Sequence, residues 1–287
     1  MNLEERRARI AAKREAQAKR SAQTKFEDLR IALGPLTSAM CHEASWRTED
    51  RLYPFWQVYA DEIEEVLRFA DAQGQRSRYW PRLTARKAQR DSGLDELRIA
   101  SYFHYNEFQM VEWEPLGQNG HRGEYLIAGP SRECIFVEVK GPRWEGELKD
   151  WEISAGRTCE PKYLYAESRS LAPWKKIQFE VDKSYGKLSP TARNLLVMAG
   201  YRGFMSLDKT QAREALYNPN RSGCFTKTAY GNLGGVGIFS MGNAVNETAY
   251  EMSIFKNPFA LEPLPDDLIR AFNAELPESA TEKIMIT

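Results

Sequence analysis

The alternation of apolar and polar residues predicts helices in the first third of the chain. Within residues 54–70, Tyr59, Ile63 and Val66 recur at helical spacing and therefore share one helical face. Gly74 follows at a point where glycine commonly ends a helix. This segment is expected to pack its apolar face against another part of the protein.

A second helical stripe and three short apolar runs form the middle of the chain. The stripe covers residues 94–104, and Ser92 just before it is a residue type that caps helix N-termini. Residues 108–114, 123–128 and 134–140 are short runs separated by turn-forming residues, so they predict three strands. Later in the chain, the pattern predicts a helix over 174–188, strands over 194–199, 235–241 and 250–255, and a terminal helix from residue 263. The expected architecture is an α/β domain.

Composition divides the chain into four regions. Residues 1–30 are helix-forming but polar all round, which is typical of a solvated helix, a coiled-coil arm or a frayed tail. Residues 31–91 form a helical N-terminal region, residues 92–275 the α/β domain with a C-terminal extension, and residues 276–287 a mobile tail. The first region has an excess of Lys and Arg. A solvated face explains this excess better than RNA or phosphate contact, and a protein partner or a second copy of the chain is a further candidate for this helix.

A basic stretch with interleaved aromatic residues precedes the α/β domain. Its members are Arg76, Arg78, Tyr79, Trp80, Arg82, Arg86, Lys87 and Arg90. This composition suits phosphate contact and base stacking, and it equally suits a linker with ordinary surface charge. The pattern leaves both interpretations open.

Bulk composition indicates a protein of the cytoplasm. The 287 residues include 40 basic and 40 acidic side chains, so no global positive field indicates a nucleic-acid ligand, although a local field is sufficient to bind one. The four cysteines and three histidines do not form a zinc pattern, and reduced thiols are expected. The start of the sequence lacks an apolar signal region, and no run approaches the ~20 apolar residues of a membrane span.

Two charged residues end the most apolar of the predicted strands. Glu138 and Lys140 lie two residues apart in the run 134–140, so they share a face with Cα atoms about 6.6 Å apart. An ion away from water is costly, so charge at the end of a buried strand needs a reason. An acid and a base held side by side suit a divalent cation and a nucleophilic water. A surface ion pair is the alternative explanation.

Two further acids strengthen the first interpretation. Glu124 opens the preceding strand, and a simple hairpin would bring it close to Glu138 and Lys140. Like charges brought together need a cation or a shared proton, and Mg²⁺ prefers such oxygen ligands. Glu96 lies in the preceding helical stripe, where it faces either the sheet or solvent, and a structural pair with Arg98 or Arg90 explains it equally well.

The chain resembles the PD-(D/E)xK nuclease superfamily in three features. These are an acid on an early helix (Glu96), an acid that opens one strand (Glu124) and the E-x-K pair that ends the next strand (Glu138 and Lys140). The resemblance covers roughly residues 92–200 and implies a restriction-endonuclease-like αβββαβ core, with a mixed sheet flanked by helices. It implies that Glu124, Glu138 and the carbonyl of Val139 bind Mg²⁺ or Mn²⁺, that Glu96 assists, and that Lys140 positions the attacking water. The implied activity is phosphodiester hydrolysis of nucleic acid, with DNA favoured over RNA.

The resemblance also suggests accessory positions in the later helix. Gln178 would match a polar residue that some members place beside the site, and Lys183 would face the same way. Further basic residues proposed along the substrate path are Arg122, Lys149, Lys175 and Lys176. The tryptophans Trp113, Trp144, Trp151 and Trp174 are expected to serve mainly in packing.

One departure from the family pattern keeps a second function open. The usual Pro-Asp is Gly123-Glu124 here, and Glu is one methylene longer than Asp. A nuclease-like module with a degenerate site would instead bind nucleic acid or serve in assembly. A nucleotide-binding loop at 231–237 is disfavoured, because those glycines precede a strand, whereas a phosphate-binding loop follows one. They are expected to form a tight turn or to allow close backbone approach.

Overall fold

A computed structural model describes residues 66–83, 87–141, 172–200, 207–242 and 249–272. The chain forms two compact units, one of residues 1–85, 147–163 and 244–248, the other of residues 86–146, 164–243 and 249–287. The helices are α4 (Arg76–Leu83), α5 (Lys87–Tyr105), α7 (Pro173–Tyr185), α8 (Lys209–Leu216) and α9 (Asp266–Ala271). The strands are β1 (Gln109–Trp113), β2 (Tyr125–Ala128), β3 (Cys134–Lys140), β4 (Arg193–Ala199), β5 (Gly235–Gly242) and β6 (Ala249–Lys256). Short 3₁₀ turns are η1 (Gln118–Gly120), η2 (Pro219–Arg221), η3 (Cys224–Thr226) and η4 (Thr228–Tyr230).

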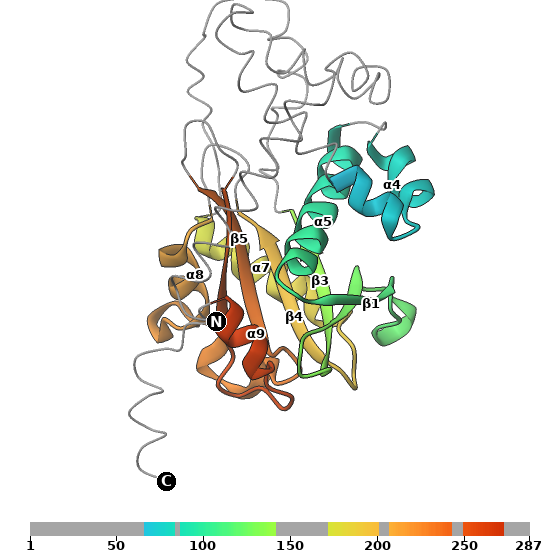
Figure 1. The fold of residues 1–287 in the computed structure, drawn as a ribbon. Coiled ribbons are helices and arrows are strands. Elements are labelled where there is room, and N and C mark those ends of the chain that lie inside the picture. The colour runs from blue at the N-terminus through green and yellow to red at the C-terminus, as the bar shows by residue number, and fades with distance from the viewer. Residues whose placement is uncertain (1–65, 84–86, 142–171, 201–206, 243–248, 273–287) are drawn as a thin grey trace, which may run out of the picture. The chain divides into compact units, whose positions relative to one another are not determined.

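The second unit is built on one mixed sheet with the strand order β1-β2-β3-β4-β5-β6 (Figure 1). The strands β1, β2 and β3 pair antiparallel, β3, β4 and β5 pair parallel, and β6 returns antiparallel to β5. The carboxyl ends of β3, β4 and β5 therefore lie at the same end of the sheet. The expected α/β class, with a mixed sheet flanked by helices, is confirmed.

Helices cover both faces of this sheet (Figure 1). On one face, Ile177 and Val181 of α7 pack with Phe136, Leu196 and Ile238 of the central strands. The other face carries α5, whose Tyr102 contacts the β5 residue Phe239 with ring centroids 5.2 Å apart. Phe103 of α5 also contacts Phe108 and Phe272, which joins the helix to the residue that directly follows α9. Burial of these apolar side chains is the main favourable contribution to folding.

A network of hydrogen bonds fixes the amino end of β4. The fully buried Asn194 amide donates to the carbonyls of Ser189, Ala192 and Asn232 at 2.8 to 2.9 Å, and its oxygen accepts from the Ser189 N–H at 2.8 Å. Asn257 donates likewise to two carbonyls of the 230–233 turn. Buried polar groups are tolerated when they are paired in this way.

The predicted strands are confirmed, with boundaries shifted by one or two residues, but several helices differ from expectation. Helix α5 begins at Lys87, so Ser92 lies inside the helix and is not its N-cap. The described members of the basic stretch are helical, because α4 covers residues 76–83 and α5 contains Lys87 and Arg90, while Arg86 lies outside the described residues. Helix α8 was not predicted, because two of its three buried residues are alanines, which leave little hydrophobic pattern.

The glycines at the start of β5 allow close backbone approach, as expected. A methyl group on Gly235 would lie 2.8 Å from the Phe255 carbonyl oxygen, and one on Gly234 would lie 3.0 Å from the Asn194 carbonyl oxygen. The 3₁₀ turn η4 precedes them and β5 follows, so this segment does not open a helix as a phosphate-binding loop does.

Residues 66–83 belong to the first unit. Residues 66–72 are helical and end at Gly74, whose φ of +68° is readily adopted by glycine. Within α4, the guanidinium groups of Arg78 and Arg82 lie 5.1 and 5.3 Å from the ring centroid of the buried Tyr79. The predicted regions 1–30 and 276–287 lie outside the described residues.

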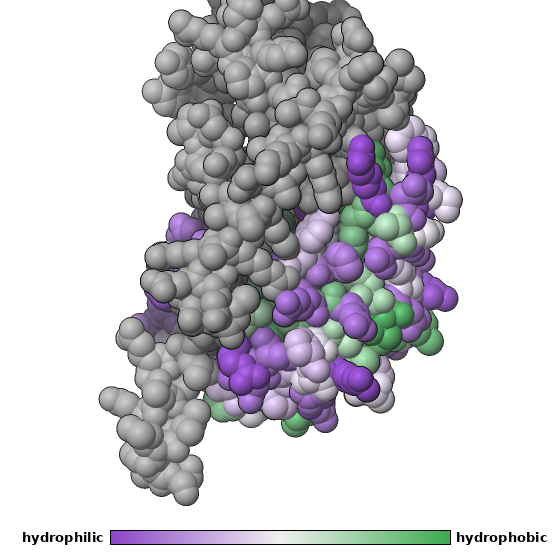
Figure 2. Space-filling view, in the orientation of Figure 1, coloured by the Kyte–Doolittle hydropathy of each residue, from purple (hydrophilic) through white to green (hydrophobic). Residues whose placement is uncertain are grey.

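The face of the molecule drawn in Figure 2 mixes hydrophilic and hydrophobic residues. In the part of the chain that the structure describes, no helix combines the length and the apolar character needed to cross a membrane.

Candidate functional site

The E-x-K pair, Glu138 and Lys140, lies at the carboxyl end of β3. The two-residue period of a strand places both side chains on the same face of the sheet. Glu138 and Lys140 pair in register with Leu196 and Met198 of β4, so they project toward the sheet face covered by α7. Their side chains differ in exposure, at 2% for Glu138 and 19% for Lys140. The Lys140 ammonium donates a short hydrogen bond to Glu138 Oε1. This contact fixes the ammonium at the edge of a buried site.

Glu124 is brought to the same place by the β2–β3 hairpin. Tyr125 pairs with Val137, and the Glu124 N–H donates to the Val137 carbonyl at 3.0 Å, so Glu124 lies beside Glu138. Burial raises the pKa of Glu124 well above its ordinary value, and the carboxylates of Glu96 and Glu138 raise it further. The Lys140 ammonium opposes this shift but does not cancel it. The site therefore resists holding three ionised carboxylates.

Helix α5 supplies the third acid. Glu96 is 3% exposed, and its carboxyl group is hydrogen-bonded to that of Glu124. Ser92, one turn earlier in α5, donates from its hydroxyl to Glu96 Oε1 at 3.0 Å. The Tyr125 hydroxyl reaches the Glu96 carbonyl at 3.5 Å, which links α5 to the start of β2. The structure thus brings together all four residues predicted to carry the chemistry.

A fourth acid, Asp95, was not predicted from the sequence. It is 1% exposed, and a methyl group on Gly141 would lie 2.5 Å from Asp95 Oδ2. The carboxylate therefore lies beside the residue that follows Lys140. The sequence signal that could have revealed Asp95 is the pair of consecutive acids, Asp95 and Glu96, in an otherwise apolar stripe.

The donor chemistry of this cluster fits a hard divalent cation. Glu138 Oε2 is buried and has no hydrogen-bond partner among the described residues. Carboxylate oxygens, with the carbonyl of Val139 between the two charged residues, are ligands of the type that Mg²⁺ and Mn²⁺ accept. Within the described ranges, however, no three His, Cys, Asp or Glu side chains form a group that could already hold a metal ion. The acids are close together without forming a finished coordination shell.

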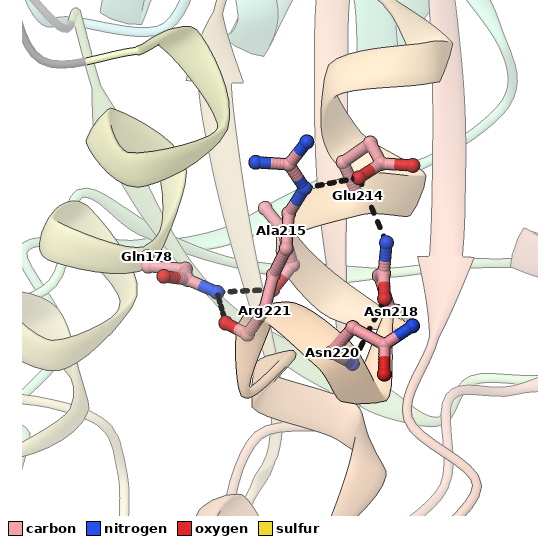
Figure 3. Close-up of polar contacts among 6 residues, drawn as sticks. All are labelled: Gln178, Glu214, Ala215, Asn218, Asn220 and Arg221. Carbon is pink, nitrogen blue, oxygen red and sulfur yellow. Dashed lines mark hydrogen bonds and ion pairs between the residues drawn. The ribbon is translucent and has the colours of Figure 1, made fainter.

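The accessory residues lie elsewhere. Gln178 of α7 donates its amide to the carbonyls of Ala215 and Arg221, both at 3.0 Å (Figure 3). Lys183 is exposed, and its ammonium lies 5.8 Å from the ring centroid of Phe179. In the described part of the chain, neither side chain contacts the acid cluster. Gln178 fastens the loop after α8 to α7.

The proposed substrate-path residues and tryptophans are dispersed. Arg122 donates to the Glu114 carbonyl at 2.8 Å, and Lys176 pairs with Glu180 at 3.3 Å. Trp113 contacts Tyr125 with ring centroids 5.7 Å apart, consistent with a packing role. Lys149, Trp144 and Trp151 lie outside the described residues.

Comparison of this chain with family models, with curated proteins and with solved structures found no match. The functional argument therefore depends on the site itself.

Proposed function

We propose that this protein is a metal-dependent nuclease that hydrolyses phosphodiester bonds in nucleic acid, with DNA favoured over RNA. The observation that carries the proposal is the convergence of the buried Glu96 and Glu138 with the half-buried Glu124 and one ammonium group. Because a structural ion pair needs only one acid for each base, the additional buried carboxylates call for a ligand of opposite charge. The order α5-β1-β2-β3-α7-β4 also supports the proposal, because it follows the αβββαβ order that the family resemblance implies.

Each residue has a distinct role in this proposal. Glu124, Glu138 and the Val139 carbonyl would hold Mg²⁺ or Mn²⁺, with Glu96 reaching the ion directly or through water. The bound cation would polarise a phosphate oxygen and lower the pKa of a water molecule. Lys140, oriented by its contact with Glu138, would align the attacking water and stabilise the negative charge that develops on the phosphate.

A degenerate nuclease-like module that binds nucleic acid or serves in assembly is the second candidate. The direct contact of Lys140 with Glu138 favours it, because this contact neutralises one acid without a metal. Such a module would retain the fold and bind nucleic acid without cutting it.

Cleavage of single- and double-stranded DNA and RNA tests the proposal. Wild type is assayed with Mg²⁺, Mn²⁺ or EDTA beside Glu138→Gln and Lys140→Met. The matched control is Lys209→Met, which breaks the exposed Lys209–Glu251 pair at 3.1 Å. We expect metal-dependent cutting that both site variants lose by 100-fold or more, on the order seen when a charge-stabilising group is removed, and that the control retains.

Two outcomes count against the proposed activity. Cutting that survives both site substitutions would show that the site assignment is wrong. Binding of nucleic acid without cutting, by a wild type that is folded, would favour the degenerate module.

A further inference from the structure

The outer surface of α7 carries an exposed aromatic ring between two ammonium groups. Phe179 is 47% exposed, and the ammonium groups of Lys176 and Lys183 lie 5.1 and 5.8 Å from its ring centroid. An exposed phenylalanine gains little from the core of its own protein. Flanked by cations, it has the composition of a platform on which a flat, electron-rich ring can stack near a negative charge.

A second aromatic ring on α7 also has cations beside it, but it is half-buried and packs against the hydrophobic core. Trp174 lies in the first turn, with the Lys175 ammonium 5.3 Å and the Arg221 guanidinium 4.6 Å from its ring centroid. Gln178 holds the Arg221 segment in place through the Arg221 carbonyl (Figure 3). The position of the guanidinium is therefore built into the fold.

The acids around this surface are already engaged. Glu180 is buried and pairs with Lys176, while Asp182 accepts a hydrogen bond from the Tyr230 hydroxyl. Glu214 accepts from Arg221 Nε at 2.5 Å and from Asn218 at 2.9 Å (Figure 3). In contrast, Lys175 and Lys183 form no ion pair with any residue that the structure describes. The local charge of the surface is therefore positive, although the whole chain is neutral.

The topology places one end of this surface near the acid cluster. Helix α7 connects β3 to β4, and these strands are parallel, so the helix runs back along the sheet. Its N-terminus, with Trp174 and Lys175, thus lies toward the carboxyl end of β3, where Lys140 is located. A strand bound along α7 would lead toward the proposed site.

We propose that Trp174, Lys175, Phe179, Lys183 and Arg221 form a binding surface for single-stranded nucleic acid, called the α7 surface below. The lysines and Arg221 would contact phosphates, and the exposed Phe179 ring would stack on an unpaired base, while the half-buried Trp174 would hold Arg221 at the border of the surface. A duplex keeps its bases stacked on one another, so it cannot use the Phe179 ring. This inference rests on the proposed function, because it assigns to the nuclease a single-stranded substrate segment.

Fluorescence anisotropy with a labelled oligo-dT tests the α7 surface. The measurement is made in EDTA, so that cleavage cannot interfere. Phe179→Leu keeps an apolar side chain but removes the ring, and Lys183→Glu reverses one charge. The matched controls are Phe259→Leu, at a phenylalanine that is 42% exposed, and Lys209→Glu.

We expect Phe179→Leu to weaken binding about 5- to 150-fold, the range for loss of one stacked base. Phe179→Trp, which keeps a ring, should bind within about 3-fold of wild type, since stacking tolerates any aromatic platform. Lys183→Glu should weaken binding and also lower the salt dependence, because each phosphate contact on a single strand contributes a slope of about 0.7. The two controls should bind as wild type does.

Several results would overturn the α7 surface. One is that Phe179→Leu binds oligo-dT as tightly as wild type does. The others are that wild type binds duplex DNA as tightly as oligo-dT, or that it binds an acidic peptide in preference to oligo-dT. The two proposals also fail separately. If wild type cuts DNA while the α7 variants bind normally, only the surface is refuted. If ring loss abolishes binding but wild type never cuts, only the nuclease activity is refuted.

Discussion

Replacing Glu124 with glutamine is expected to stabilise the protein while removing the proposed nuclease activity. The substitution keeps the shape of the side chain and removes one negative charge from a buried site. That site holds the carboxyl groups of Glu96, Glu124 and Glu138 and the single ammonium of Lys140. With these four groups ionised, and with the neighbouring Asp95 left out of the sum, they carry a net charge of −2, from three negative charges and one positive charge. The variant would carry −1.

The sign of the effect follows from the raised pKa of Glu124, and its size from the cost of a buried, poorly paired polar group. Burial and the two neighbouring carboxylates make its ionised form unfavourable in the folded protein. Each pKa unit corresponds to about 1.4 kcal/mol, and a buried, poorly paired polar group costs about 1–3 kcal/mol. We expect Glu124→Gln to raise the free energy of unfolding by about 1–3 kcal/mol at pH 7.5. The matching rise in Tm is about 2–4 °C for each kcal/mol.

The pH dependence has a definite sign. Because the pKa of Glu124 is higher in the folded than in the unfolded protein, the folded wild type binds more protons above the unfolded pKa of about 4.3. Wild-type stability is therefore lost as pH rises through the folded pKa. The advantage of Glu124→Gln should be small near pH 4 and should grow toward pH 8.

Urea denaturation in EDTA, from pH 4 to pH 8, measures this effect. Lys140→Met should have the opposite effect, because it leaves the acids without their ammonium group. We expect it to lower the free energy of unfolding by about 3 kcal/mol. Adding Mg²⁺ should stabilise wild type more than Glu124→Gln, because only wild type keeps the full set of acids. A variant that is less stable than wild type at pH 7.5, or a difference that does not vary with pH, would refute the reasoning.

Three further predictions concern the scaffold. Asn194→Asp should cost about 3–5 kcal/mol in urea denaturation, because a carboxylate would face three backbone carbonyls that now accept hydrogen bonds; a loss below about 1 kcal/mol would contradict this. Burial would raise the pKa of Asp267, yet hydrogen bonds from the backbone and hydroxyl of Ser131 and from the Leu268 N–H hold it below its ordinary value. Asp267→Asn should therefore lower the free energy of unfolding by less than about 1 kcal/mol at pH 7, given the exposure of the side chain. The difference from wild type should shrink as pH falls below the unfolded pKa of about 3.9 and through the lower folded pKa, whereas a constant difference would exclude a charge effect. Gly235→Ala should lower stability by about 1–3 kcal/mol in thermal unfolding, because its methyl group would contact the Phe255 carbonyl, and an unchanged Tm would show that the sheet adjusts freely.

The sequence was sufficient to predict that Glu124 lies beside Glu138 and Lys140, because two strong local rules determine this contact, whereas the orientation of Glu96 was left open. A strand has a period of two, which places Glu138 and Lys140 on one face. A short turn between β2 and β3 then sets the register that brings Glu124 to Glu138. Both rules act over a few residues, so no knowledge of the rest of the fold was needed.

The remaining features depend on tertiary packing. Helix α5 extends seven residues before Leu94 through polar positions, where periodicity gives no indication, so Ser92 was assigned to the wrong place in the helix. The burial of Asp95 becomes apparent only when Gly141 is placed beside it. The contacts of Gln178 are with a loop beyond α8, a helix whose small buried residues left no pattern to recognise.

The different connections of β3 to its two neighbours have a kinetic consequence. A tight turn joins β2 to β3, whereas pairing of β3 with β4 requires a crossover that spans residues 141–192. Hairpins close in about 1–10 μs, and distant parallel pairing is slower because loop closure costs entropy. Glu124 and Glu138 should therefore repel each other before the sheet is complete. Relief of that repulsion by Glu124→Gln should appear mainly as faster refolding, with the unfolding rate nearly unchanged in stopped-flow measurements.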